Sequence, residues 1–320
     1  MSDLNETIRG LVDTEILIAE REIRRSIIEQ RQAVLVRTRE LWEKAEQKPR
    51  LNTTTGNVAY VSRSEAMKYG RFEKLTEEMH GIRRVGALSD ISTIERAGVK
   101  VYEAEFYGNA WVYREGYGLP ITGGVQVRLI AQALYSDHSG GKFNDRLRIN
   151  WSTWEQEILQ SVTRGLNQGL SYSAMAEEIT KITDRQYWRS LRVARTEASR
   201  IQSQAHLDAD DLVNELGIEN RKRWIATIDD RTRDNHADMD GEYADKNGIF
   251  HLPGGASGPA PGLTGVASED INCRCNYILE FPDIEPPEER RIRGEGIVPF
   301  RTFFEGQEHA TLTEVRANKE

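Results

Sequence analysis

An uninterrupted helical pattern over residues 3–47 constrains the fold of this chain more than any other feature of the sequence. The segment has no proline and a single glycine, Gly10. Its apolar positions recur in steps of four, four and three residues, a period of about 3.67 residues per turn that is typical of a straight α-helix. This first stripe consists of Ile8, Val12, Ile16, Ala19, Ile23, Ile27, Gln30, Val34, Thr38 and Leu41. With a rise of about 1.5 Å per residue, the segment is predicted to be a rod about 65 Å long.

A second apolar stripe lies on another face of the same predicted helix and consists of Leu11, Ile18, Ile28, Leu35 and Trp42. A helix with two apolar faces has to bury both of them against other surfaces. Two interpretations remain open. The helix belongs to a hairpin or bundle inside the protein, or it is a docking arm for a larger assembly.

Composition and charge narrow the classes of function. Forty-three Lys and Arg residues against 51 Asp and Glu residues give a net charge of −8. This balance argues against a generally basic nucleic-acid coat, because phosphate binding needs a cationic face, but a local basic patch remains open. No segment approaches the roughly 18 apolar residues of a membrane span, and the N-terminus lacks the features of a signal peptide. We therefore expect a soluble protein made in a cytoplasm, with no membrane partner.

The predicted organisation is α+β: a long N-terminal helix, a helical body, a small β-containing C-terminal domain and an extended tail. A helix is expected over residues 64–81, and another over residues 186–216. Strands are expected at residues 223–228 and 273–279 because β-branched and aromatic residues alternate there with polar ones. The five segments are the N-terminal helix (1–50), a mixed middle region (51–150), a helical part (151–217), a β-containing part (218–281) and the tail (282–320).

Polar residues recur on one face of the helix predicted at residues 186–216. Arg192, Thr196, Arg200 and Gln204 are spaced by four residues and include part of the sequence Arg195-Thr196-Glu197. Three interpretations remain open for this face: it is solvated, it is a buried hydrogen-bond network that ties the helix to the β-containing part, or it is catalytic.

Two cysteines and a histidine in the β-containing part suggest a metal site. Alternation along the predicted strand places Cys273 and Cys275 on one side, and His236 follows a loop that returns towards them. With His251 these residues would give zinc four ligands of suitable chemistry. Structural zinc sites usually have two to four residues between paired cysteines, whereas one residue separates this pair. Packed buried thiols, a zinc site with His236, and a catalytic thiol all remain open.

A glycine- and proline-rich insertion, residues 253–262, lies between the two predicted strands. It resembles a phosphate-binding loop in composition, but no Gly-Lys-Ser/Thr follows it. The segment is therefore interpreted as a flexible connector.

Taken in order, these segments resemble a known family. The carriers of the resemblance are Arg195-Thr196-Glu197, the strand of Trp224 with Asp229 to Arg233 and His236, the Asp240-Gly241 turn, Phe250 with the glycine-rich insertion, and Asn272-Cys273-Arg274-Cys275. Over residues 151–281 the chain resembles the minor head, or head-morphogenesis, proteins of tailed bacteriophages, typified by the F protein of phage Mu. The resemblance implies a virion protein present in few copies at the portal vertex inside the capsid, which is in the host cytoplasm during assembly and in some relatives travels with the DNA at ejection.

The leading hypothesis is thus a structural protein of the phage head. Its expected partners are the portal protein, then scaffold or major capsid protein, and DNA bound weakly and without sequence preference. The rival hypothesis is an enzyme, metal-assisted or nucleotide-modifying, that uses His236, Glu197 and Cys273/Cys275. No residue is assigned a catalytic role, and the cofactor is either none or zinc, held by His236, Cys273 and Cys275. A structural network is expected among Arg195, Thr196, Glu197, Arg200, Trp224, Asp229 and Arg233.

Overall fold

The computed structural model describes residues 2–46, 49–51, 58–60, 71–138, 141–227, 229–282 and 307–318. Contacts between residues divide the chain into two compact units, which we describe separately. The terminal unit comprises Met1–Ala19, Ile94–Phe143 and Arg192–Glu320, and the bundle unit comprises Glu20–Thr93 and Asn144–Leu191. No helix in the described ranges is long and apolar enough to cross a membrane.

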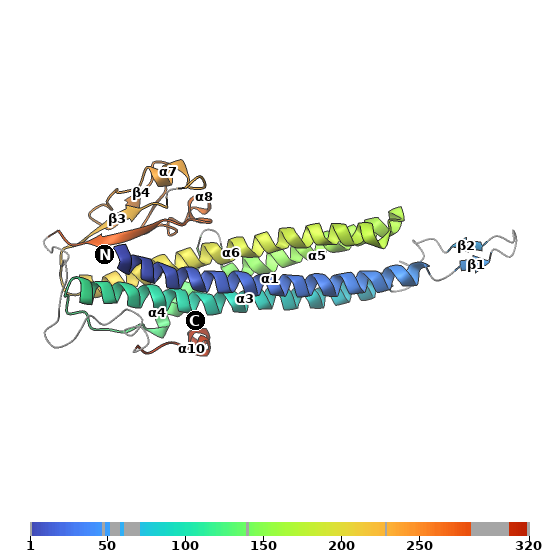
Figure 1. The fold of residues 1–320 in the computed structure, drawn as a ribbon, viewed down its shortest axis with the longest axis horizontal. Helices are drawn as coiled ribbons and strands as arrows, with labels where there is room; N and C mark the ends of the chain where they lie inside the picture. Colours follow the sequence, from blue (N-terminus) through green and yellow to red (C-terminus); the bar gives the residue numbers. More distant parts are fainter. Residues whose placement is uncertain are drawn as a thin grey trace. The chain divides into compact units, whose positions relative to one another are not determined.

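Four long helices dominate the structure: α1 (Ser2–Glu46), α3 (Arg71–Trp111), α5 (Phe143–Gln168) and α6 (Tyr172–Asn214). They confirm the α+β class with a helical body, and α1 confirms the long N-terminal helix (Figure 1). The helix predicted at residues 186–216 is the second half of α6, which begins earlier because no proline or glycine interrupts residues 172–214. Of the helix expected at residues 64–81, residues 64–70 lie outside the described residues and the rest belongs to α3.

Segments of all four helices pack together in the bundle unit. Trp151 and Trp154 of α5 are completely buried and meet edge to face, with ring centroids 5.0 Å apart. The absence of a side chain at Gly86 of α3 makes room for Trp151, since a Cβ atom there would lie 2.4 Å from the indole ring. Tyr172 of α6 donates a hydrogen bond to the Leu35 carbonyl of α1. The same unit includes the antiparallel hairpin β1 (Pro49–Leu51) and β2 (Val58–Tyr60).

The two apolar stripes of α1 have different environments. Along the first stripe every residue except Ile16 is buried, including the polar Gln30 and Thr38. On the second stripe Leu11, Ile18 and Ile28 are exposed at 37%, 38% and 41%. One face of α1 is therefore buried within the protein, and much of the other face is exposed to solvent; we call this second face the open face of α1.

Shorter helices complete the terminal unit. The last turns of α3 lead into the π-helix η1 (Val112–Gly116), and α4 (Val127–Tyr135) follows. Most of the expected extended tail, residues 283–306, lies outside the described residues, but its end is helical. There α10 (Leu312–Ala317) begins with a capping box at Thr311 and packs against α4. Arg316 of α10 forms an ion pair with Glu95 of α3.

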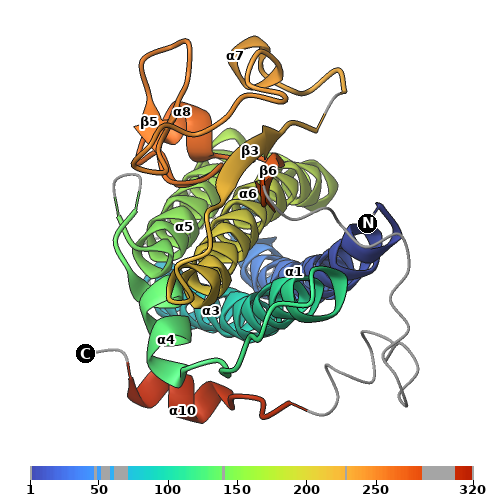
Figure 2. The same ribbon diagram turned by 90° about the vertical axis from the view of Figure 1, so that its left-hand side faces the viewer.

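The β-containing part consists of very short strands. β3 (Arg221–Ile225) pairs antiparallel with β6 (Asn276–Glu280), and β4 (Phe250–His251) pairs antiparallel with β5 (Ser257–Gly258). Two single-turn helices, α7 (Asp234–Ala237) and α8 (Ala267–Asp270), lie between the strands in sequence. The β3–β6 ribbon runs beside the C-terminal half of α6 (Figure 2), and a core of Trp224, Phe250 and Tyr277 fills this part.

Two expectations about this part are wrong. The predicted strand at 273–279 begins only at Asn276, because pairing with β3 ends at Ile225, so both cysteines precede the strand and strand alternation does not orient them. The insertion at 253–262 is packed rather than loose: Ala260 is fully buried, and Ser203 of α6 donates a hydrogen bond to the Pro261 carbonyl.

Candidate metal centre

Two thiols and one imidazole converge in the buried interior of the β-containing part. The Nδ1 atom of His236 lies 3.5 Å from the sulfur of Cys275 and 3.8 Å from that of Cys273. All three candidate ligand atoms lie within 4.8 Å of one another. Bonds of about 2.3 Å to sulfur and about 2.0 Å to nitrogen at a tetrahedral angle would separate sulfur and nitrogen by about 3.5 Å, so the arrangement fits zinc.

Each ligand is positioned by a tight turn and not by a strand. The single turn of α7 presents His236, whose backbone N–H donates to the Arg233 carbonyl. The backbone turns sharply at Asn272, the one described residue other than glycine with a positive φ, at 56°. Asparagine tolerates this left-handed conformation better than most residues. The turn brings Cys273 and Cys275 into the interior, where both are free thiols.

A carboxylate orients the histidine from its far side. The Nε2 atom of His236 lies 3.1 Å from the Glu269 carboxylate, which also accepts a hydrogen bond from Asn235. Burial alone would raise the pKa of Glu269, but the hydrogen bonds from Asn235 and His236 outweigh it and lower the pKa. A carboxylate on the second nitrogen of an imidazole is the usual support of a metal-bound histidine, because it fixes the tautomer that leaves Nδ1 free to bind.

The pKa values of the two thiols are shifted in opposite directions. A hydrogen bond from the Cys273 thiol lowers the pKa of Cys275 to about 4, helped by His236, whereas the same interaction and burial raise the pKa of Cys273. Cys275 is therefore the thiol that loses its proton more readily, and the thiolate is the form that binds metals.

Aromatic side chains enclose the cluster. The Trp224 ring meets the His236 ring edge to face at 5.6 Å and the Phe250 ring at 5.2 Å. His251, considered above as a fourth ligand, is instead exposed and bound to Ser257 and Asp245. Among the described residues the cluster thus has three protein ligands.

The Arg-Thr-Glu sequence of α6 touches the cysteine loop directly. The Thr196 hydroxyl accepts a hydrogen bond of 3.1 Å from the Asn272 backbone N–H. Glu197 and Arg200 form an ion pair of 2.9 Å in which both side chains are at most 3% exposed. Arg200 also donates to Ser136 beside α4. Thr196 and Arg200 are therefore part of a buried network, and the alternative of a solvated face does not describe them.

The other residues of the expected structural network lie apart from this ion pair. Trp224 is a core residue, and Asp229 holds the guanidinium of Arg274 at the surface, which lowers the pKa of Asp229. Arg233 donates to the Ile271 carbonyl. Arg195 is exposed and lines a cavity next to Cys273.

A second buried network, around His206, was not predicted from the sequence. His206 of α6 lies 3.3 Å from the Glu105 carboxylate of α3 and 3.7 Å from that of Asp210, and its ring stacks on Tyr277 of β6. The hydroxyl groups of Tyr113 and Tyr277 donate to Asp210. This network joins α3, α6 and β6. It could not be predicted because its residues lie far apart in the sequence, and each of them is ordinary in its own helix or strand.

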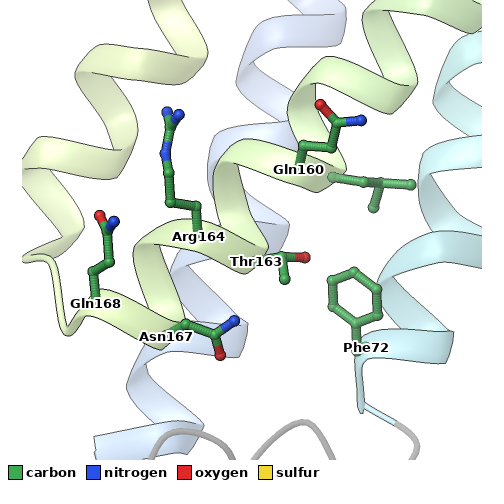
Figure 3. Close-up of a pocket in the computed structure, with 7 residues that line it drawn as sticks. Phe72, Gln160, Thr163, Arg164, Asn167 and Gln168 are labelled. Atoms are coloured by element: carbon green, nitrogen blue, oxygen red, sulfur yellow. The ribbon is translucent and has the colours of Figure 1, made fainter.

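Of the cavities, one belongs to this site and another lies in the bundle unit. The cavity next to Cys273 has a volume of about 780 Å³. The second, of about 580 Å³, lies between Phe72 of α3 and the last turns of α5 (Figure 3), where Arg164 projects away from the Phe72 ring. None of the described residues that line this second cavity is a histidine, cysteine or carboxylate, so it offers no comparable chemistry.

Comparison with known proteins finds a similarity to phage head proteins. Residues 156–278 match the family model described as Phage Mu protein F like protein. The minor head protein GP7 of Bacillus phage SPP1 is 27% identical over 247 residues, which cover 74% of this chain and 76% of GP7. No solved structure matches the chain.

A second relative carries a different name. The NAD(+)--arginine ADP-ribosyltransferase EFV of Enterococcus faecalis is 29% identical over 259 residues, which cover 81% of this chain but 53% of that protein. The chain thus spans about half the length of this relative. The family model matches residues 156–278, the segment that holds the thiol–imidazole cluster, and the likeness to GP7 extends over most of the chain, so this chain is similar to the phage minor head proteins of the Phage Mu F-like family.

Proposed function

We propose that this chain docks onto the portal protein inside the phage capsid through the open face of α1, and that a zinc ion stabilises its β-containing part. The observation that carries the proposal is that Leu11, Ile18 and Ile28 of the second stripe are exposed, while nine of the ten residues of the first stripe are buried. Several exposed apolar side chains on one helix are typical of a surface that a partner covers.

The similarity to a minor head protein supports the choice of partner. It suggests a location at the portal vertex in the capsid interior, after a stage in the host cytoplasm during assembly. Scaffold or major capsid protein are further partners on this hypothesis, and the protein contacts the DNA weakly and leaves with it at ejection. The proposed location, partners and ejection with the DNA rest on the similarity to minor head proteins and on the exposed face of α1.

The zinc assignment rests on the donor set. Two thiolates and an imidazole supported by Glu269 match zinc in both distance and chemistry. His236, Cys273 and Cys275 would hold the ion, and the ion would tie α7 to the loop before β6. A part built of strands of two to five residues gains most from such a cross-link.

Geometry gives less support to the enzyme hypothesis. A catalytic site needs its side chains to converge on a cleft. Glu197 is buried and paired with Arg200, and neither Glu197 nor His236 is among the described residues that line the cavity at Cys273. About half of the ADP-ribosyltransferase lies outside the match, so its activity is not carried over to this chain.

Portal docking is tested by isolating procapsids assembled with this chain and dissociating them gently. We expect the chain to be recovered with portal protein and to be missing from procapsids assembled without portal. Equal recovery from procapsids that lack portal would refute portal docking and favour attachment to the capsid shell.

A further inference from the structure

The cavity next to Cys273 is lined by an unusual concentration of arginines. We propose that it is a binding site for phosphate groups, supplied by a nucleic-acid backbone or by a free nucleotide. Five of its lining residues are arginines: Arg192, Arg195, Arg231, Arg233 and Arg274. Asp13 is the one acidic residue among the described residues that line it. On a chain with a net charge of −8, such a grouping is a local reversal of charge.

One wall of the cavity is a face of α6. Arg192, Arg195, Ser199 and Gln202 follow one another at steps of three, four and three residues, so they project from the same side of the helix. Arg192 and Arg195 are exposed. This face adjoins the Thr196 side chain, whose hydrogen bond to Asn272 fixes the helix against the cysteine loop.

A second part of the lining comes from the loops around the thiol cluster, and its arginines are held in place. Arg274 donates hydrogen bonds to the Asp229 carboxylate, and Arg233 donates to the Ile271 carbonyl. Both guanidinium groups therefore need little reordering when a ligand binds, which reduces the entropic cost of binding. Arg231 lies on this side too and forms an ion pair of 3.6 Å with the same Asp229 carboxylate, which offsets part of the positive charge of this wall.

Phosphate fits this lining better than other anions. Arginine is the residue that recognises phosphate with paired, parallel N–H donors, and several arginines around one cavity match a ligand with several charged oxygens. The side chains of Ser199, Gln202, Thr227, Asn272 and Asn276 add neutral hydrogen-bonding groups. A volume of about 780 Å³ accommodates a nucleotide or a short stretch of backbone. Contacts to phosphate fix the position of a nucleic acid without reading its bases, so we expect no sequence preference.

This inference deepens the weak contact with DNA proposed above by naming its site, and it does not depend on portal docking. It rests on the cavity within the terminal unit, whereas the docking proposal rests on the open face of α1. The two can fail separately, because incorporation into heads and binding of phosphate are measured by different assays.

The test compares the wild-type protein with the double variant Arg192→Gln/Arg195→Gln. The control is Arg21→Gln/Arg25→Gln, which removes two exposed arginines from α1 in the bundle unit. Binding of a fluorescently labelled 20-base-pair DNA duplex is followed by anisotropy over a range of salt concentrations, and binding of ADP by calorimetry. All four substituted residues are exposed, so unchanged melting curves are expected for both variants.

We expect the cavity variant to bind DNA at least about tenfold more weakly at low salt, with a salt slope shallower by about 1.8, since each phosphate contact contributes about 0.9. The control variant should keep the wild-type slope. Loss of ADP binding in the cavity variant, with DNA binding equal in all three proteins, would identify a free nucleotide as the phosphate source. The proposal is overturned if neither ligand distinguishes the cavity variant from the control.

Discussion

Asp90 shows how one residue can make the bundle unit sensitive to pH. Its carboxyl group is completely buried and accepts hydrogen bonds from the Trp151 indole and the Ser190 hydroxyl, both on the same oxygen. Burial raises the pKa of Asp90 from 3.8 to about 7, against the opposing effect of these two hydrogen bonds. The second oxygen has no hydrogen-bond partner among the described residues.

The raised pKa predicts a loss of stability with rising pH. Below pH 3.8 both states hold the proton, whereas between pH 3.8 and about 7 the folded state keeps it and the unfolded state releases it. The free energy of unfolding should therefore fall over this range, by at most about 4 kcal/mol for a shift of this size. The variant Asp90→Asn, which keeps an acceptor for Trp151 and Ser190, should be more stable than wild type at pH 8 and should lose this pH dependence.

Urea unfolding of wild type and Asp90→Asn at pH 5 and pH 8 measures this pH dependence. At each pH the difference in free energy of unfolding between the two proteins reports on Asp90 alone, because the other titrating groups are the same in both. If the free energies of unfolding of the two proteins differ by the same amount at both pH values, Asp90 does not ionise on unfolding in this range.

Among the elements, the network at His206 joins α3, α6 and β6. Burial alone would lower the pKa of His206, but the charges of Asp210 and Glu105 outweigh it and raise the pKa above 6.5. Because the folded-state pKa is raised, the stabilisation by His206 is complete below pH 6.5 and is lost as the pH rises through the higher folded value. Lys222 and the hydroxyl groups of Tyr113 and Tyr277 are the other polar groups that face Asp210.

The variant His206→Phe should test this network. Phenylalanine can still stack on Tyr277, whose ring centroid lies 4.1 Å from that of His206, but it leaves two buried carboxylates without their cation. We expect a loss of about 3 to 5 kcal/mol in the free energy of unfolding at pH 6 and a smaller loss at pH 9. If denaturation experiments give equal losses at both values, the histidine is not charged in the folded protein.

The short strands of the β-containing part predict a dependence on zinc. Adding zinc to the chelator-treated protein should raise its melting temperature, with about 2.7 kcal/mol of stabilisation at a free concentration one hundred times the dissociation constant. The rise should disappear in Cys275→Ser and persist in His251→Asn, since His251 lies outside the cluster. Elemental analysis should find one zinc per chain, and a melting temperature indifferent to zinc would argue for packed thiols alone.

How far the sequence predicted these elements depends on the range of the interactions involved. The first stripe of α1 could be predicted because helical periodicity is local, and burial follows it at nine of its ten positions. The start of β6 could not, because it is set by pairing with β3 more than 50 residues earlier. The proximity of His236 to the thiols was expected, but for a wrong reason, since turns at Asn272 and α7 create it in place of strand alternation.

At the scale of the whole molecule, the proposed docking through α1 predicts different roles for the two faces of this helix. Substitutions on its two faces should have different consequences. Ile23 and Ile27 are 1% and 3% exposed, so Ile23→Asp/Ile27→Asp should unfold the bundle unit and prevent incorporation into heads for that reason alone. That variant by itself does not separate folding from docking.

The exposed stripe provides the variant that does. Leu11→Lys/Ile18→Lys/Ile28→Lys changes three exposed side chains, each of which should alter the free energy of unfolding by less than about 0.5 kcal/mol. The purified triple variant should therefore melt close to wild type, while three lysines on an apolar contact surface should prevent docking because their charges would have to be desolvated. Quantitative mass spectrometry of procapsids should show the variant depleted at least about tenfold relative to portal protein. A folded triple variant that enters heads at the wild-type level would show that the open face of α1 is not the docking surface, and the portal contact would then have to be sought on another element.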